Sequence, residues 1–374
     1  MLFKRKPDRA PEVPLAIAHD YLTQRGGAER VVLAMHKAFP QAPIYTTLYN
    51  PETTYPEFKD CTIIVSPLNR VGLFKKDHRL ALPLLPFFVS RQAIHAQKVL
   101  VSSTGWAHGF KLPEKTLVYC HSPARWIYLT DQYLGKNPHQ LVATLFKLMR
   151  PFLKVWDQKA AQKNRNYLAN STTIQKRIFD VYQKDSEILF PPYSVDPAGR
   201  QEPIAGLEEF LSDRYFIIVS RLLPYKNVQY AVEAFSRTDK KLLVVGSGPI
   251  LDELKASATS NVAFASNISD AQMRYAYAHA YGALAVSHED FGITPLEAGA
   301  FGKPIIALKA GGFLDTIVEG LNGTFISEPS AQAILEAVEN FDQGKFSQEA
   351  ITEHIKKFGE DRFIQALQDR IDVL

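Results

Sequence analysis

The chain is poor in cysteine and lacks any long apolar run. Its 374 residues include two cysteines, Cys61 and Cys120, which cannot form a disulfide framework and fit a reducing compartment. The most apolar stretch, Leu80–Val89, is ten residues long and contains two prolines, whereas a membrane-spanning helix needs about 20 apolar residues. The basic start Met1–Arg5 is followed by polar residues rather than an apolar segment, so we expect no signal peptide.

Three motifs of enzyme chemistry are also absent. There is no Gly-x-Ser-x-Gly and no Walker loop, which argues against a simple esterase and against a P-loop nucleotide hydrolase. No Asp-x-Asp occurs either, so the sequence lacks the paired aspartates that would hold a divalent metal on a diphosphate. We therefore expect neither a metal nor another cofactor.

The composition is that of a globular protein with an uneven distribution of charge. Hydrophobic residues make up 46% and charged residues 22%, and the length favours two domains. Residues 1–190 contain 27 Lys and Arg against 14 Asp and Glu, whereas the remainder is acidic. The first half is therefore expected to meet an anionic partner such as lipid headgroups, a lipid diphosphate or nucleic acid. A solvated surface without a charged partner is the alternative, and the absence of a basic stripe with interleaved aromatics argues against nucleic acid.

Strand and helix patterns alternate in two blocks on either side of a proline-rich linker at 191–197. This order predicts an α/β protein with two doubly wound, Rossmann-like domains that face a cleft. We place the first domain at 1–192 and the second at 193–345. Residues 346–374 are expected to form a C-terminal helix that packs back toward the first domain.

The segment 287–323 has the most informative pattern of the chain. The apolar run Ala283–Val286 before it predicts a buried parallel strand, and Glu289 follows at the mouth of that strand. Thr294 is a natural N-cap, which places Glu297 in the first turn of the next helix. Ligands of open α/β sheets bind at the carboxyl ends of strands, so the two carboxylates are expected to hold hydroxyl groups of one ligand. The free amides of 292–296 favour a phosphate in the same space, which together suggests a sugar nucleotide.

A structural explanation of the same residues remains open. Thr294 and Glu297 also fit a capping box, in which Glu297 only accepts from a backbone amide. The downstream Gly311-Gly312 and Asn322-Gly323 would then be ordinary turns.

Two cations follow the first strand of the second block. Arg221 offers a bidentate fork and Lys226 a mobile point charge, a pair suited to a diphosphate. The alternative is two exposed cations without a ligand. The next strand ends in Val-Val-Gly-Ser-Gly-Pro, which lacks the third glycine of a dinucleotide fingerprint because position 251 is leucine.

The first block contributes candidates of its own. Gly26 and Gly27 allow a close approach of the backbone to a ligand before a helix. His121 ends a strand and is expected to face the cleft, although a structural histidine is the alternative. Asp20 ends the first strand, and Trp126 offers an aromatic face for a sugar, with core packing as the alternative for Trp126.

In combination, these motifs resemble family 4 glycosyltransferases of the GT-B fold. The resemblance rests on the order strand, Glu, Phe-Gly, helix with Glu, Gly-Lys-Pro, strand, Gly-Gly and Asn-Gly, and on the Arg-x4-Lys spacing. It covers residues 13–330. His-Asp-Tyr-Leu-Thr-x-x-Gly-Gly-Ala-Glu-Arg and Cys-His-Ser-Pro-Ala-Arg-Trp are similar to segments of bacterial mannosyltransferases that build O-antigen and exopolysaccharide units.

The resemblance implies a retaining, metal-independent transferase and a role for each matching residue. It places His121, Glu289, Arg221 and Lys226 at the reaction centre, and Asp20 and Trp126 at the acceptor. The implied donor-binding residues are Gly26, Gly27, Asn267, Ile268, Phe291, Gly292, Ile293, Thr294 and Glu297. Asp290 departs from the family, in which many members have glycine, and this leaves the donor sugar in doubt.

The expected activity is transfer of mannose from GDP-mannose to a glycan or a polyprenyl-diphosphate-linked acceptor in surface polysaccharide synthesis. A sugar-nucleotide 2-epimerase of the same fold and a non-catalytic nucleotide-sugar-binding protein are the alternatives. We expect a cytoplasmic protein without a nucleic-acid partner, and leave open a peripheral location on an anionic inner face of the cytoplasmic membrane.

Overall fold

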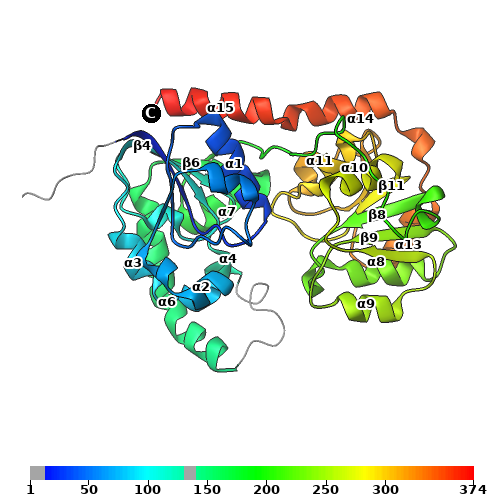
Figure 1. The fold of residues 1–374 in the computed structure, drawn as a ribbon, viewed down its shortest axis with the longest axis horizontal. Coiled ribbons are helices and arrows are strands. Elements are labelled where there is room, and N and C mark those ends of the chain that lie inside the picture. The colour runs from blue at the N-terminus through cyan, green and yellow to red at the C-terminus, as the bar shows by residue number, and fades with distance from the viewer. Residues whose placement is uncertain (1–12, 130–139) are drawn as a thin grey trace, which may run out of the picture. The chain divides into compact units, whose positions relative to one another are not determined.

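A computed structural model describes residues 13–129 and 140–374 (Figure 1). The chain divides into two compact units. Unit 1 comprises 1–190 together with Asp361–Leu374, and unit 2 comprises Pro191–Glu360. Within the described ranges, no helix is both long enough and apolar enough to cross a membrane.

Unit 1 is built on a parallel sheet of seven strands, counted over the described residues, in the order β3-β2-β1-β4-β5-β6-β7. Its central strands are buried on both faces, which explains their nearly continuous apolar sequence. The strands are β1 Val13–His19, β2 Ile44–Thr46, β3 Ile63–Val65, β4 Ala96–Ser103, β5 Thr116–Cys120, β6 Asn166–Ala169 and β7 Glu187–Ile188.

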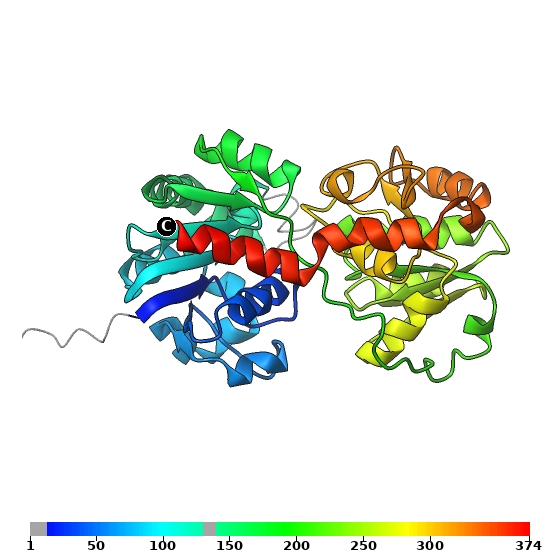
Figure 2. The same ribbon diagram turned by 90° about the horizontal axis from the view of Figure 1, so that it is seen from above.

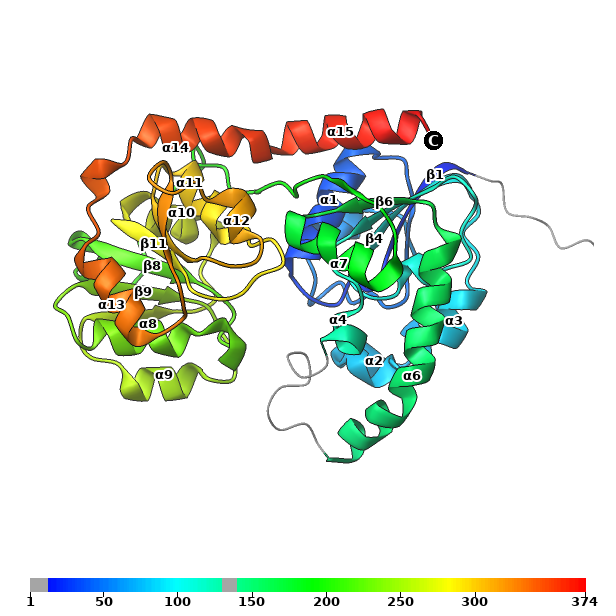
Figure 3. The same ribbon diagram turned by 180° about the vertical axis from the view of Figure 1, so that it is seen from behind.

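Helices cover both faces of this sheet (Figures 1 and 3). They are α1 Gly27–Ala38, α2 Gly72–Lys76, α3 Leu85–Arg91, α4 Arg125–Tyr128, α6 Gln140–Lys163, α7 Thr172–Tyr182 and α15 Glu360–Asp372. Ser171 is the N-cap of α7, and its hydroxyl accepts from the Ile174 amide at 3.1 Å. Pro151 lies inside α6, and the helix continues through it.

The last helix, α15, returns to unit 1 and packs along α1 (Figure 2). Phe363, Leu367 and Ile371 are buried in the same apolar cluster as residues of β1 and α1. The Lys98 ammonium also donates to the carbonyl of Ile371 at 2.6 Å. The predicted C-terminal segment 346–374 is thus divided, since residues 346–360, which include α14 Gln348–Ile355, lie in unit 2.

Unit 2 contains a second parallel sheet, with six strands among the described residues, in the order β10-β9-β8-β11-β12-β13. The α/β class with two doubly wound sheets is therefore confirmed. The elements of unit 2 not yet named are β8 Tyr215–Val219, α8 Val228–Phe235, β9 Lys241–Val245, α9 Leu251–Ser257, β10 Val262–Ala265, α10 Asp270–His279, β11 Gly282–Ala285, α11 Thr294–Ala300, β12 Ile305–Leu308, α12 Phe313–Thr316, β13 Gly323–Ile326 and α13 Ala331–Glu339.

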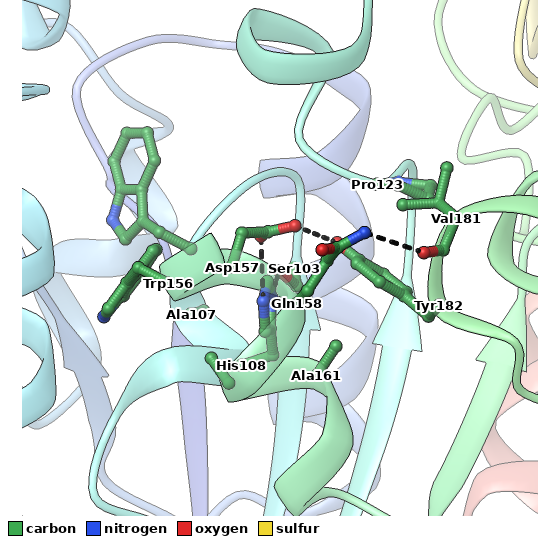
Figure 4. Close-up of polar contacts among 12 residues, drawn as sticks. Ser103, Ala107, His108, Pro123, Trp156, Asp157, Gln158, Ala161, Val181 and Tyr182 are labelled. Carbon is green, nitrogen blue, oxygen red and sulfur yellow. Dashed lines mark hydrogen bonds and ion pairs between the residues drawn. The ribbon is translucent and has the colours of Figure 1, made fainter. Parts of the chain in front are cut away.

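Helix α6 is anchored in unit 1 by the buried carboxylate of Asp157 (Figure 4). Its Oδ1 lies 3.1 Å from Nε2 of His108, in the geometry of an ion pair rather than of a linear hydrogen bond. Its Oδ2 accepts from the hydroxyls of Tyr128 at 2.7 Å and Tyr182 at 3.0 Å. Burial alone would lower the pKa of His108, but the contact with Asp157 and its charge outweigh burial and raise that pKa.

We predict that Asp157→Asn lowers the free energy of unfolding of unit 1 by about 3 kcal/mol, because it breaks a buried ion pair and leaves His108 without its counter-charge. Urea denaturation near pH 6 measures the change. Lys159→Gln, an exposed change on the same helix, is the control and should leave stability within about 0.5 kcal/mol.

The same pair predicts a pH dependence. The folded-state pKa of His108 is raised, so its contribution is fully present below the unfolded value of 6.5 and is lost as pH rises through the folded pKa. The stability gap between wild type and Asp157→Asn should therefore narrow as pH rises above 6.5. If the stability difference between the two proteins stayed constant or widened above pH 6.5, His108 and Asp157 would not form a charged pair.

Candidate functional site

A pocket of about 420 Å³ opens at the carboxyl ends of the central strands of unit 2. Chain segments from β8, β9, β11 and the loops after them form its wall. Its lining includes Ser220, Arg221, Lys226, Gly246, Ser247, Asn267, Ile268, Ser287, Glu289, Gly292, Ile293, Thr294 and Phe313. Eight of the residues predicted from the sequence as functional thus border one hollow: Arg221, Lys226, Asn267, Ile268, Glu289, Gly292, Ile293 and Thr294.

The strand order explains why the hollow lies there. The first strand of the unit, β8, pairs with β9 on one side and with β11 on the other. The chain therefore leaves β8 toward one edge of the sheet and leaves β11 toward the opposite edge. At such a switch point the two following loops diverge, and ligands of open α/β sheets bind in the resulting crevice.

An ion pair between Lys226 and Glu289 lies in the pocket. The Lys226 ammonium donates to Oε1 of Glu289, and the Ser287 hydroxyl donates to the same oxygen. The Lys226 and Glu289 side chains are only 10% and 21% exposed, so solvent screens their attraction weakly. The pair joins the loop after β8 to the loop after β11 and gives the pocket one cation and one carboxylate side by side.

The segment between Arg221 and α8 holds Lys226 close to the end of β11. Asn227 has a left-handed backbone conformation with φ of 62°, and Nδ2 of its side chain donates to the carbonyl of Val286 at 3.1 Å. That bond ties the residue after Lys226 to the end of β11. Arg221 is exposed, and its guanidinium donates to the hydroxyl of Tyr225 at 3.2 Å. Arg221 therefore presents its charge to solvent at the pocket rim, whereas Lys226 lies deeper.

Two glycines after β9 let the chain pass close to the Arg221 loop. A Cβ on Gly246, whose φ is +155°, would lie 1.9 Å from the carbonyl oxygen of Ser220. A Cβ on Gly248 would lie 2.2 Å from the carbonyl oxygen of Leu222. The two glycines of this Val-Val-Gly-Ser-Gly-Pro turn therefore permit close backbone packing beside the pocket.

The Gly311-Gly312 pair packs beneath the loop that carries Glu289. A Cβ on Gly311 would lie 2.2 Å from the carbonyl oxygen of Glu289, and one on Gly312 would lie 2.2 Å from the Cα of Phe291. The Gly312 amide also donates to the Glu289 carbonyl at 3.0 Å. These glycines are therefore more than an ordinary turn, because they support the backbone of the pocket wall.

Helix α11 begins one residue away from the predicted cap. Ile293 is the N-cap, and Thr294 is the first helical residue, with no side-chain cap hydrogen bond. The predicted capping role of Thr294 is therefore wrong. Pro295 falls within the first helical turn, where its missing amide donor costs no helical hydrogen bond.

Glu297 does lie in the first turn of α11, but it is absent from the residues that line the pocket. Its Oε2 accepts from the hydroxyl of Tyr277 at 3.0 Å. Tyr277 is fully buried in α10, and burial, followed by the charge of Glu297, raises its pKa. Phe291 is buried as well and packs against Phe358 at 6.1 Å. The donor contacts expected of Glu297 and Phe291 stay predictions.

In unit 1, the carboxylate of Asp20 holds the loop that follows β4. It is fully buried and accepts from the backbone amides of Trp106 and Ala107, each at 2.6 Å. The amide and the hydroxyl of Thr104 donate to its other oxygen. The acceptor contact expected of Asp20 is not favoured by this arrangement, since the carboxylate serves the fold.

His121 lies at the end of β5 in a chain of three polar side chains. Its Nε2 is 2.8 Å from the hydroxyl oxygen of Ser102, which is 3.0 Å from Nδ1 of His19. Nδ1 of His19 is also 3.0 Å from the carbonyl oxygen of Ser102, which can only accept, so His19 carries a proton on Nδ1. Burial lowers the pKa of His19, despite the nearby charge of Asp20, and keeps the ring neutral.

The remaining candidates of unit 1 lie in two places. Trp126 is in the core, 2% exposed, with its ring edge-on to Trp106 at 6.4 Å, so it offers no open face to a sugar.

Gly26 is the N-cap of α1 and Gly27 its first residue. A Cβ on Gly26 would lie 2.5 Å from a carboxylate oxygen of Glu29.

Three residues that shape these sites were missed from the sequence. Ser287, Asn227 and Ser102 each supply a hydrogen bond to a candidate or to its loop. Ser287 and Ser102 could be suspected from their position directly after or at the end of an apolar strand, and Asn227 only from its position directly after Lys226. Over the described ranges, no group of three or more His, Cys, Asp or Glu side chains is arranged to hold a metal ion.

A family model described as Glycosyl transferases group 1 matches residues 200–360, which is most of unit 2. A D-rhamnosyltransferase WbpZ of Pseudomonas aeruginosa is 27% identical over 285 residues, covering 67% of this chain and 72% of that protein. The O-antigen chain mannosyltransferase C of Escherichia coli is 28% identical over 184 residues, or 46% of this chain and 48% of that protein. An alpha-1,3/1,6-mannosyltransferase ALG2 of Kluyveromyces lactis is 24% identical and covers 79% of this chain and 69% of that protein.

Solved structures share the fold along nearly the whole chain. Anabaena Alr3699/HepE in complex with UDP has a TM-score of 0.70 at 14% identity, over 97% of this chain and 100% of that chain. The sucrose-phosphate synthase of Thermosynechococcus elongatus has a TM-score of 0.69 at 15% identity, over 96% and 98%.

The fold and the pocket at the switch point define a protein of the GT-B architecture. The sequence matches then specify the class: the chain is a GT-B glycosyltransferase that resembles O-antigen mannosyltransferases. The predicted resemblance to GT-B glycosyltransferases and to O-antigen mannosyltransferases is confirmed, whereas the assignment to family 4 stays a prediction.

The hydrogen-bond chain predicts the tautomer of His121. The Ser102 hydroxyl has one proton, and among its contacts in the described chain only Nε2 of His121 can accept it. His121 should therefore be protonated on Nδ1, which two-bond ¹H–¹⁵N correlation NMR of the imidazole detects. Ser102→Ala should shift the ring toward Nε2–H, whereas Ser103→Ala, whose hydroxyl contacts His108, should not. Finding Nε2–H in the wild type would refute the assignment.

Proposed function

We propose that this protein is a retaining, family 4 glycosyltransferase that moves mannose from GDP-mannose to a glycan or a polyprenyl-diphosphate-linked acceptor. The mannosyltransferases among its relatives support the sugar, and the O-antigen enzyme supports a surface polysaccharide as the product. The proposed reaction needs no metal. The expected location is the cytoplasm, at the inner face of the cytoplasmic membrane, where such acceptors are carried.

The observation that carries the proposal is the Lys226–Glu289 pair inside the unit 2 pocket. A nucleotide sugar has a diphosphate next to a ring of hydroxyl groups. A cation beside a carboxylate complements these two groups, since the ammonium attracts phosphate oxygens and the carboxylate accepts hydrogen bonds from hydroxyls. A ligand of this kind would exchange the internal ion pair for contacts of the same chemistry.

The other pocket residues extend this match. Arg221 at the rim supplies a second cation for the diphosphate, and the amides of Gly292–Thr294 supply neutral donors. Asn267 and Ile268, in the loop after β10, also line the pocket, and their backbone groups are our candidates for holding the base. Glu297 would hold the ribose hydroxyls if its contact with Tyr277 opened.

The proposed step is a front-face displacement. The acceptor oxygen forms a bond to the anomeric carbon while the bond from that carbon to the phosphate oxygen breaks. The acceptor proton passes to an oxygen of the departing diphosphate, so no protein base is required. Arg221 and Lys226 stabilise the negative charge that develops on the diphosphate. In unit 1, His121 is the candidate for orienting the sugar, and the amides beside Gly26 and Gly27 are candidates for the diphosphate.

We predict that Arg221→Ala and Lys226→Ala each lower kcat/KM about 100- to 1,000-fold, because each removes a cation from the transition state. Release of nucleoside diphosphate in the presence of acceptor measures the rate. Lys255→Ala, an exposed cation on α9, is the matched control and should retain wild-type activity. Wild-type rates in both pocket variants would refute the assignment.

The base preference is tested by thermal unfolding in the presence of nucleotides. GDP and GDP-mannose should raise the melting temperature, and UDP should not, because selective binding to the folded state adds about 2.7 kcal/mol at 100 times Kd. An epimerised donor formed without acceptor would favour a 2-epimerase. Donor binding without turnover, even with acceptor, would favour a non-catalytic binding protein.

A further inference from the structure

Helix α6 has an apolar stripe on its solvent side. Leu148, Phe152 and Val155 follow the spacing i, i+4 and i+7, which places them on one face of a helix. Leu148 is 75% exposed and Phe152 is 67% exposed. The opposite face, with Leu153 and Asp157, is buried in unit 1. Large apolar side chains are usually buried, so a contiguous exposed row of them indicates a binding surface.

Contacts on either side of the stripe show which neighbour it adjoins. The Trp156 indole donates to the Ser90 hydroxyl of α3 at 2.9 Å. On the other flank of α6, Arg150 donates to the carbonyl of Ile127 in α4, and Gln158 to that of Val181 in α7. Phe152 precedes Trp156 by one turn, so the stripe lies on the α3 side of α6.

Helix α3 continues the apolar surface. Phe87 lies three residues before Ser90, hence on the same face of α3, and is 54% exposed. Leu84, just before the helix, is exposed as well. Both helices lie at the end of unit 1 away from α15 (Figures 1 and 3). We name the surface formed by Leu84, Phe87, Leu148, Phe152 and Val155 the α3–α6 face.

The charges around this face have one sign. Helix α6 contains five Lys and Arg and one acidic residue, Asp157, which is buried and engaged with His108. Arg91 is exposed and lies over the Phe87 ring, 3.6 Å from its centroid. Lys154 and Lys159 are exposed on α6. From Arg70 to Lys163 the sequence has 15 Lys and Arg against four Asp and Glu.

We propose that the α3–α6 face docks on an anionic lipid bilayer. This inference rests on the proposed function, in which the acceptor is carried by a lipid, and assigns the membrane contact to particular residues. Exposed Leu and Phe side chains insert at the boundary of headgroups and acyl chains, while flanking Lys and Arg contact anionic headgroups. Because the helix is long, basic and apolar on one side only, it lies in the plane of the membrane surface.

A protein partner is a poorer match for the same surface. Protein interfaces are depleted in lysine, whereas this face is bordered by the exposed Lys159, one turn after Val155. Lys154 lies on the other flank of α6, with its ammonium 6.0 Å from the centroid of the Tyr128 ring. Long lysine stems can extend toward headgroups while apolar neighbours enter the lipid. The buried Asp157 anchor holds α6 against unit 1, so the stripe is presented without rearrangement of the helix.

The test is co-sedimentation of the full chain with vesicles of phosphatidylglycerol mixed with phosphatidylcholine. The wild type should bind these vesicles at low salt and should bind pure phosphatidylcholine weakly. The double variant Leu148→Ser/Phe152→Ser should weaken binding about tenfold or more, because it removes two inserted side chains. Lys154→Gln/Lys159→Gln should weaken it about fivefold per charge and reduce its salt dependence.

Phe179→Ser is the matched control, since Phe179 is 51% exposed on α7 of the same unit but outside the α3–α6 face. It should bind vesicles like the wild type. Far-ultraviolet circular dichroism confirms that each variant is folded. Unchanged vesicle binding by Leu148→Ser/Phe152→Ser, or equal loss in Phe179→Ser, would overturn the assignment.

The two proposals fail separately. Nucleotide binding and transfer to a water-soluble glycan should be unaffected by the α3–α6 variants. If those activities are present but no variant or wild type binds vesicles, the docking face is refuted and the proposed function stands. If vesicles bind as expected but no sugar nucleotide binds, the proposed function is refuted instead.

Discussion

The reversal of strand order between β8 and β11, at the centre of the parallel unit 2 sheet, is the constraint on which the candidate site depends. Because β8 and β11 are neighbours whose following loops diverge, the ends of both strands are left open to a ligand. Lys226 comes from one loop and Glu289 from the other, and their ion pair closes the gap between them. The two glycine pairs pack against these same two loops, Gly246 and Gly248 against the loop after β8 and Gly311 and Gly312 against the loop after β11.

Polar side chains have different tasks in the two units. In unit 2, Lys226 and Glu289 interact with each other and border a pocket, so a ligand can compete for them. In unit 1, Asp20 and Asp157 are buried and held within their own unit, Asp20 by four hydrogen bonds and Asp157 by two tyrosine hydroxyls and the His108 ring. A carboxylate at the end of a strand is therefore not in itself a sign of binding. What distinguishes the two cases is whether the carboxylate is enclosed among partners inside its unit, as for Asp20 and Asp157, or borders a pocket beside a cation, as for Glu289.

Much of the fold was accessible from the sequence because buried parallel strands are short apolar runs. The strand predicted at Ala283–Val286 corresponds to β11 Gly282–Ala285, one residue earlier. The two-residue strand β7 has no such run, so no apolar pattern indicates it. The cap of α11 was assigned to Thr294 because its residue type suits a cap, but in the structure Ile293 is the N-cap and Thr294 is the first helical residue.

The site residues were accessible where a motif specified both residue type and spacing, as for Arg221, Lys226 and Glu289. They were not accessible where the outcome depended on packing. Trp126 is an aromatic residue near a candidate histidine, yet its ring is used by the core. The link from His121 through Ser102 to His19 joins residues far apart in the sequence, and only the parallel pairing of β1, β4 and β5 brings them together.

The return of α15 to unit 1 makes that unit discontinuous along the chain. Phe363, Leu367 and Ile371 complete an apolar cluster that otherwise contains residues from before position 190. During synthesis, the whole of unit 2 emerges before this part of the core is made. Unit 2 can therefore fold first, while β1 and α1 keep an uncovered apolar surface until residues 361–374 have left the ribosome.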